Sequence, residues 1–133
     1  MTGKTDVRTP PATAIILVVE DEPIIRLAAV DLVEEAGYIA VEASNAAEAV
    51  RILETRPDIR VVFTDIDMPG SMDGMKLALC VRDRWPPIKL IVVSGHHTPG
   101  AADMPEGAVF FSKPYSESAL TAALKQLVGE VSG

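Results

Sequence analysis

Five short runs of β-branched and other apolar residues recur along the sequence, and longer segments with helical spacing separate them. The runs read AIILVV, YIAVEA, RVVFTD, IKLIVVS and AVFFS. Because they are apolar at nearly every position, we expect helices to cover both faces of the sheet that they form. The pattern therefore predicts an α/β fold, with a parallel sheet between two helical layers and right-handed crossovers.

The segments between the runs have the spacing of amphipathic helices. The predicted core faces consist of Ile25, Ala28, Leu32 and Ala36 in the first helix, Ala46, Ala49, Val50 and Leu53 in the second, and Leu120, Leu124, Leu127 and Val131 in the last. We expect Gly37 to end the first helix and Ser44 to cap the second.

Length and charge limit the other possibilities. The chain has 133 residues and a net charge of −7, with no block of lysine and arginine. We expect one domain over residues 14–131 after a flexible tail at 1–13, and no direct binding to nucleic acid or to a membrane. The longest apolar run, 14–19, is too short to span a bilayer, which predicts a soluble cytoplasmic protein.

Chemically reactive side chains follow the predicted strands at their carboxyl ends. Glu20 and Asp21 follow the first strand, Asp65 and Asp67 the third, Ser94 the fourth and Lys113 the fifth. Ligands of open α/β sheets bind at this edge. Because several carboxylates would repel one another there, we expect Mg²⁺ on Asp21 and Asp65, with Ser94 and Lys113 available for phosphoryl oxygens.

The motifs ILVVEDEP, VVFTDIDMPG, IVVSG and FFSKPY resemble those of the receiver domains of two-component response regulators. The resemblance covers residues 14 to about 130 and implies a flavodoxin-like, doubly wound (βα)5 sandwich with strand order 2-1-3-4-5. It also implies that Asp65 is the phosphoacceptor. The Mg²⁺ ligands would be Asp21, Asp65 and the main-chain carbonyl of Asp67, with Glu20 bound through water.

The resemblance further assigns a switch role to Ser94, phosphate binding to Lys113 and a cis bond between Lys113 and Pro114. Gly95 would be the small residue that lets the phosphoryl group approach. Phe110 falls at the position of the family's switch aromatic residue, and Phe111 should point to the opposite face of the strand. Asp67 and His96 occupy positions that tune dephosphorylation in the family.

The implied function is a signalling switch rather than a turnover enzyme. The donor would be a histidine kinase or a histidine phosphotransfer protein, and the domain would be a monomer or a phosphorylation-dependent homodimer. Since the chain ends at Gly133, we expect output through a separate partner protein, or use of the domain as a phosphate sink or relay.

Two segments depart from the family pattern. The motif MPGSMDG has one residue more than usual, so the loop after Asp65 should bulge. The segment HHTPGAADMPEG is rich in proline and glycine, which predicts a short, shifted or mobile fourth helix.

Two other functions compete with this interpretation. Asp65 and Asp67 also fit the Asp-x-Asp pair of haloacid-dehalogenase-type phosphatases, but the residues expected after the second aspartate and after the lysine are missing. A flavodoxin-like nucleotide-binding module would need a phosphate loop where this chain has Glu20, Asp21 and Glu22.

Overall fold

The computed structural model describes residues 13–67, 74–95 and 107–132, which form five strands and four helices. The strands are β2 (Ile15–Val19), β3 (Ile39–Ala43), β4 (Ile59–Asp65), β5 (Lys89–Ser94) and β6 (Val109–Ser112). The helices are α1 (Pro23–Glu35), α2 (Ala46–Thr55), α3 (Gly74–Arg84) and α4 (Glu117–Ser132). Each apolar run of the sequence thus corresponds to one strand.

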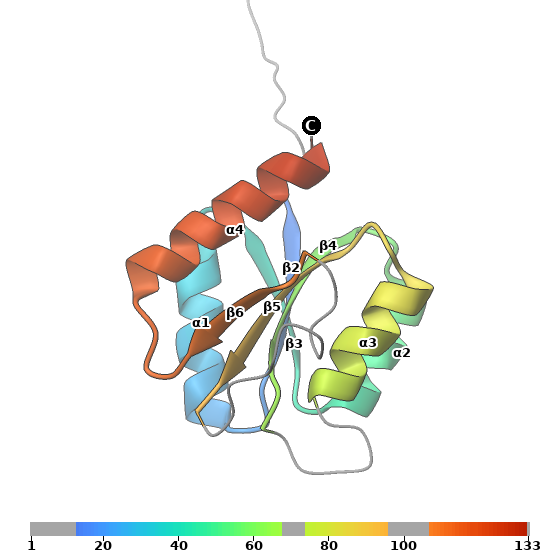
Figure 1. Ribbon diagram of the computed structural model, residues 1–133, viewed down its shortest axis with the longest axis horizontal. Coiled ribbons are helices and arrows are strands. Elements are labelled where there is room, and N and C mark those ends of the chain that lie inside the picture. Colours follow the sequence, from blue (N-terminus) through green and yellow to red (C-terminus); the bar gives the residue numbers. More distant parts are fainter. Residues whose placement is uncertain (1–12, 68–73, 96–106, 133) are drawn as a thin grey trace, which may run out of the picture.

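All neighbouring strands are parallel, and their order across the sheet is β3-β2-β4-β5-β6 (Figure 1). Counted along the chain this is the order 2-1-3-4-5, which confirms the predicted doubly wound topology. The winding reverses between β2 and β4, so the crevice for a ligand opens at the carboxyl ends of these two strands.

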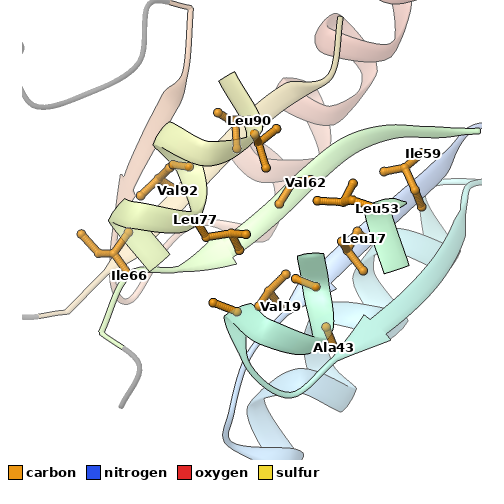
Figure 2. Packing of buried hydrophobic residues seen from close by; sticks show 14 residues of the cluster. Leu17, Val19, Ala43, Leu53, Ile59, Val62, Ile66, Leu77, Leu90 and Val92 are labelled. Atoms are coloured by element: carbon orange, nitrogen blue, oxygen red, sulfur yellow. The ribbon is translucent and has the colours of Figure 1, made fainter. Parts of the chain in front are cut away.

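The sheet separates two hydrophobic clusters, because successive side chains of a strand point to opposite faces. On β2, Leu17 and Val19 belong to one cluster, whereas Ile16 and Val18 belong to the other. Helices α2 and α3 cover the first cluster (Figure 2), and α1 and α4 cover the second (Figure 1). The continuous apolar runs therefore have the physical cause that we expected, burial on both faces.

The core face of α1 differs from the prediction. Ile25 and Ala28 are exposed, and the buried side chains are Ala29, Val30, Leu32 and Val33. The first turns of α1 stand at the edge of the sheet, where the described part of the chain leaves them uncovered. The predicted faces of the other two helices are confirmed for Ala46, Ala49 and Leu53 and for Leu120, Leu124 and Leu127, which are buried.

Helix boundaries agree with the prediction at Gly37 and differ at Ser44. Gly37 follows α1 with a φ of 99°, a conformation that glycine adopts without strain. The cap of α2 is Asn45, whose side chain accepts a hydrogen bond from the N–H of Glu48 at 2.8 Å. Ser44 instead donates from its N–H and its hydroxyl to the Glu48 carboxylate, which lowers the pKa of Glu48.

Several expectations fall outside the described residues. They concern the tail, the bulged loop at 68–73, the irregular fourth helix and His96.

Candidate functional site

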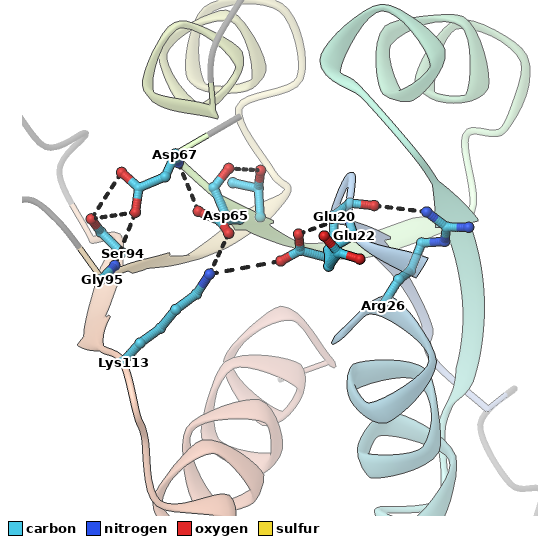
Figure 3. Close-up of polar contacts among 9 residues, drawn as sticks. Glu20, Glu22, Arg26, Asp65, Asp67, Ser94, Gly95 and Lys113 are labelled. Atoms are coloured by element: carbon cyan, nitrogen blue, oxygen red, sulfur yellow. Dashed lines mark hydrogen bonds and ion pairs between the residues drawn. The ribbon is translucent and has the colours of Figure 1, made fainter. Parts of the chain in front are cut away.

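The carboxyl edge of the sheet brings together side chains from the ends of four strands (Figure 3). Glu20 follows β2, Asp65 ends β4, Ser94 ends β5 and Lys113 follows β6. Glu20 and Asp65 are each only 5% exposed, and Ser94 is also buried. Because buried charged groups are costly unless they are paired, the contacts among these residues define what the site can do.

Both oxygens of the Asp65 carboxylate have donors. The main-chain N–H of Asp67 donates to Oδ1 at 2.7 Å, and the ammonium group of Lys113 donates to Oδ2. Burial works to lower the pKa of Lys113, but the hydrogen bond and charge of Asp65 outweigh it, so this pKa is raised. Lys113 is therefore a stable cation against the Asp65 carboxylate.

Glu20 is the second buried acid of the site. Burial raises the pKa of Glu20 to about 7, the N–H of Glu22 opposes this shift with a 3.0 Å hydrogen bond, and the Asp65 carboxylate adds to it. Lys113 Nζ lies 3.9 Å from Glu20 Oε1. The edge thus carries more negative charge than its single lysine compensates.

Arg26 on α1 holds the backbone of this acidic segment. Its guanidinium group donates to the main-chain carbonyl of Glu20 at 2.9 Å (Figure 3). It also donates to the carboxylate of Glu42 at 3.0 Å. Sequence reasoning missed this residue, because nothing in the local pattern around Arg26 indicates a contact with the residue that follows β2, six positions earlier.

The Asp67 side chain turns toward β5 (Figure 3). Ser94 Oγ donates to Asp67 Oδ1 at 3.1 Å and Oδ2 at 3.0 Å, and the N–H of Gly95 donates to Oδ2 at 2.9 Å. The sequence indicated only the main-chain carbonyl of Asp67 as a ligand, so this carboxylate-hydroxyl pair is a further feature of the site.

Gly74 marks a close approach that sequence reasoning also missed. A Cβ atom at Gly74 would lie 2.0 Å from the main-chain oxygen of Asp65 and 2.5 Å from Cα of Ile66. The start of α3 therefore packs directly on the backbone that carries Asp65. Glycine is tolerated at a helix start, so its position along the chain gave no signal of this contact. At Gly95, by contrast, an added Cβ would make ordinary contacts with Lys113.

The donor set suits a hard cation. Among the described residues no three side chains of His, Cys, Asp or Glu converge into a ready-made metal cage. Mg²⁺ does not need one, since it retains waters and binds through one or two carboxylates together with phosphate oxygens. Glu20 and Asp65 are buried oxygen donors that share one cation, Lys113, and exposed Asp21 lies beside them. These residues fit the predicted cofactor.

The two phenylalanines of β6 point to opposite faces, as expected. Phe110 packs against the cluster under α2 and α3, and Phe111 packs against the other cluster, with its ring 6.4 Å from that of Tyr115. The bond between Lys113 and Pro114 is cis, which confirms the implied geometry. A small recess beside Asp65 and Lys113 is also lined by Ile25 and Tyr115.

Comparison with known proteins decides the family. Residues 16–125 match the family described as the response regulator receiver domain. The chain belongs to this family. The matched range contains every site position from Glu20 to Lys113. Receiver domains act in two-component signalling with histidine kinases and downstream effectors, and they generally use Mg²⁺ for phosphorylation.

Two curated relatives of this receiver domain differ in how much of their own length the match covers. It is 34% identical over 120 residues to "Sensor kinase CckA" of Brucella abortus, a match that covers 87% of this chain and 13% of the kinase. It is 32% identical over 119 residues to "Response regulator receiver protein CpdR" of the same organism, with 87% and 92% covered. The chain thus spans only 13% of the sensor kinase and 24% of the "Putative response regulator NtrX-like" of Rickettsia bellii.

Solved structures of receiver domains have the same fold. A response regulator receiver protein from Sinorhizobium medicae superposes with a TM-score of 0.83 at 27% identity, covering 90% of this chain and 97% of that one. The receiver domain of the hybrid histidine kinase CckA gives 0.71 at 31% identity, covering 86% and 98%. We therefore set aside the phosphatase and nucleotide-binding alternatives.

In the part of the chain that the structure describes, every helix is too short or too polar to cross a bilayer.

Proposed function

We propose that the receiver domain, spanning residues 14–131, takes a phosphoryl group onto Asp65 from a phosphohistidine. The donor is a histidine kinase or a histidine phosphotransfer protein of the cytoplasm. The observation that carries this proposal is the Asp65 carboxylate, which ends β4 at the crevice and is held by Lys113 and by the N–H of Asp67. A buried carboxylate held in this way is oriented for attack on phosphorus.

The proposed Mg²⁺ ligands are Asp21, Asp65 and the main-chain carbonyl of Asp67, with Glu20 bound through water. When bound there, the ion neutralises charge on the phosphoryl oxygens and on the carboxylates. The buried carboxylates of Glu20 and Asp65, with exposed Asp21 beside them, support this assignment. Lys113 compensates part of that charge and can leave Asp65 for an incoming phosphoryl oxygen.

In the transfer step a carboxylate oxygen of Asp65 forms a bond to phosphorus while the bond between phosphorus and the histidine nitrogen breaks. The electron pair of the broken bond stays on the imidazole, which accepts a proton from solvent. Lys113 binds a phosphoryl oxygen through its ammonium group, because this group already lies against the Asp65 carboxylate.

The Asp67–Ser94 pair is the proposed switch. The Ser94 hydroxyl donates to the Asp67 carboxylate, so it would have to exchange this acceptor for a phosphoryl oxygen. That movement shifts the end of β5, and Phe110 on the neighbouring strand β6 responds through its packing. Phosphorylation would thus shift a population between two arrangements.

The first turns of α1 provide a surface for the donor. Ile24 is 79% exposed, Leu27 is also exposed, and Ile25 lines the recess that contains Asp65 and Lys113. Exposed apolar side chains beside the acceptor can bury themselves against a helical donor that carries the phosphohistidine. We propose output through a separate protein, since CpdR, a relative whose length the match nearly covers, consists of little more than the matched domain. The domain would act as a monomer or as a phosphorylation-dependent dimer.

Intact mass spectrometry after incubation with acetyl phosphate tests the proposal. We expect the wild type to gain one phosphoryl group with Mg²⁺ and none with EDTA, and Asp65→Asn to gain none. Asp83→Asn, which removes an exposed acid of α3, is the matched control and should behave as the wild type. A wild type without the modification, or equal modification of Asp65→Asn, would contradict the proposal.

A further inference from the structure

The opposite edge of the sheet contains a pocket that phosphorylation chemistry does not use. It has a volume of about 530 Å³ and lies between the ends of α2 and α3 and the starts of β4 and β5. Ile59 begins β4 and Asp65 ends it, so a rise of about 3.3 Å per residue puts the pocket roughly 20 Å from the acceptor. The volume lies in the range of pockets that take ligand groups.

The wall of the pocket is apolar and anchored in the core. Leu53 and Ile59 are buried members of the hydrophobic cluster under α2 and α3, and Trp85 and Ile88 pack against the same cluster. Pro86 adds a rigid, exposed side. Because its floor is part of the core, the pocket exists without a ligand and can receive an aromatic or aliphatic side chain.

The rim of the pocket is basic. Three arginines, Arg56, Arg60 and Arg84, line the pocket with one acid, Glu54, and Asp58 pairs with Arg56, which gives a local charge of +1 in a chain of net charge −7. The guanidinium carbon of Arg84 lies 4.4 Å from the centroid of the Trp85 ring. This basic rim is therefore complementary to carboxylates that surround an apolar group.

The ion pairs of the rim can be exchanged for those of a ligand. Arg84 pairs with Glu54 at 2.9 Å and Arg56 pairs with Asp58 at 3.1 Å, and all four side chains are between 40% and 51% exposed. Exposed pairs of this kind contribute between about 0 and 1 kcal/mol, so a partner that buries them can compete for the arginines.

We infer that this pocket docks an acidic segment of a partner protein, which inserts an aromatic or aliphatic side chain against Trp85 while its carboxylates pair with the arginines. Nucleic acid and anionic membranes fit less well than a short acidic segment. Their charge would extend past the three arginines onto the rest of a chain whose net charge is −7, which repels them. A partner bound here leaves Asp65 open to its phosphodonor.

Trp85 is the only tryptophan of the chain, so its fluorescence reports binding directly. The probe is the capped peptide Glu-Glu-Phe-Glu-Glu, compared with Lys-Lys-Phe-Lys-Lys and with benzoate. We expect saturable binding of the acidic peptide alone, weakened by salt. Arg60→Gln and Arg84→Gln should each weaken it about tenfold, since each removes a charged hydrogen-bonding group.

Arg82→Gln is the matched control, because Arg82 is an exposed arginine of α3 that does not line the pocket and pairs with Asp83. It should leave the affinity unchanged, as should Asp65→Asn, which separates this inference from the phosphorylation proposal. Circular dichroism verifies that each variant is folded. The inference is overturned if the acidic peptide shows no saturable binding at millimolar concentration, or if the basic peptide or benzoate binds as tightly. It is also overturned if Arg82→Gln and Arg84→Gln lose the same affinity for the acidic peptide.

Discussion

The two edges of the sheet have opposite chemistry although the same strands connect them. The carboxyl edge gathers acids, of which Glu20 and Asp65 are buried, whereas the other edge surrounds an apolar pocket with arginines that are half-buried or exposed. Buried groups interact strongly because water does not screen them, and exposed groups interact weakly. The comparison teaches that the acidic edge is sensitive to small changes and suited to a switch, while the basic edge is tolerant and suited to docking.

Gly74→Ala should produce the largest effect, because its Cβ would lie 2.0 Å from the Asp65 carbonyl oxygen. We expect a loss of stability of about 3 kcal/mol and a failure to phosphorylate. Urea unfolding and intact mass after acetyl phosphate measure the two effects. Gly129→Ala on α4 is the control, since its Cβ meets no atom within 4 Å, and it should stabilise by up to about 1 kcal/mol. Equal stability changes would refute the close packing at Asp65.

Glu20→Gln tests the buried negative charge. The pKa of Glu20 is about 7 in the folded chain against an ordinary value of 4.5, so the folded state binds this proton more tightly. Its contribution to stability is therefore present below pH 4.5 and is lost as the pH rises to about 7, with a slope of at most about 1.4 kcal/mol per pH unit.

The glutamine variant should lack this slope. Urea unfolding in EDTA between pH 4.5 and 8 compares it with the wild type, and Glu117→Gln, an exposed acid in the first turn of α4, serves as control. The same pH dependence in wild type and Glu20→Gln would show that the charge of Glu20 is compensated. In that case the contrast between the two edges would fail at its most buried acid.

Ile24→Ser tests the donor surface on α1. Ile24 is 79% exposed, so the substitution should leave stability nearly unchanged. We expect transfer from a phosphorylated histidine kinase or phosphotransfer protein to weaken about tenfold in KM, while acetyl phosphate reacts as before, because loss of a buried apolar contact costs about 1 to 2 kcal/mol. Ile39→Ser, at an exposed position of β3, is the control. An equal loss with acetyl phosphate would assign Ile24 to the chemistry instead.

Asp67→Ala should release Ser94, which would bind a phosphoryl mimic more readily. Loss of hydrogen bonds to a buried hydroxyl corresponds to about 1 kcal/mol, so the affinity for beryllofluoride should rise about fivefold. Asp67→Asn keeps an acceptor oxygen but removes the charge. Titration followed by NMR should therefore find a smaller increase for Asn than for Ala. Equal increases would mean that the charge of Asp67, and not its hydrogen bonds to Ser94, sets the affinity for beryllofluoride.

Arg84→Gln should produce the smallest effect on the domain itself. Its ion pair with Glu54 is exposed, so we expect a stability loss below about 1 kcal/mol and normal phosphorylation. Thermal unfolding and the acetyl phosphate reaction measure both. A large loss in either one would show that the basic edge is coupled to the acidic edge and would break the comparison.

The sequence predicted the fold correctly where an element is buried on both of its faces. Continuous β-branched runs predicted strands covered on both faces, and the order of the sheet agreed with the family resemblance. The prediction failed on α1, where spacing alone placed Ile25 and Ala28 in the core. Helical periodicity shows which residues share a face of the helix. It does not show which face packs on the sheet, or how many turns of the helix touch it, because these depend on how far the helix extends past the sheet.

The sequence by itself determined which reactive groups stand at strand ends, because in a parallel sheet these ends meet at one edge. Asp65, Glu20, Ser94 and Lys113 indeed lie together there. Their partners were decided only by the tertiary structure. The hold of Asp67 on Ser94 and the packing of Gly74 on the backbone of Asp65 join residues from different strands and loops, at distances that no local pattern encodes.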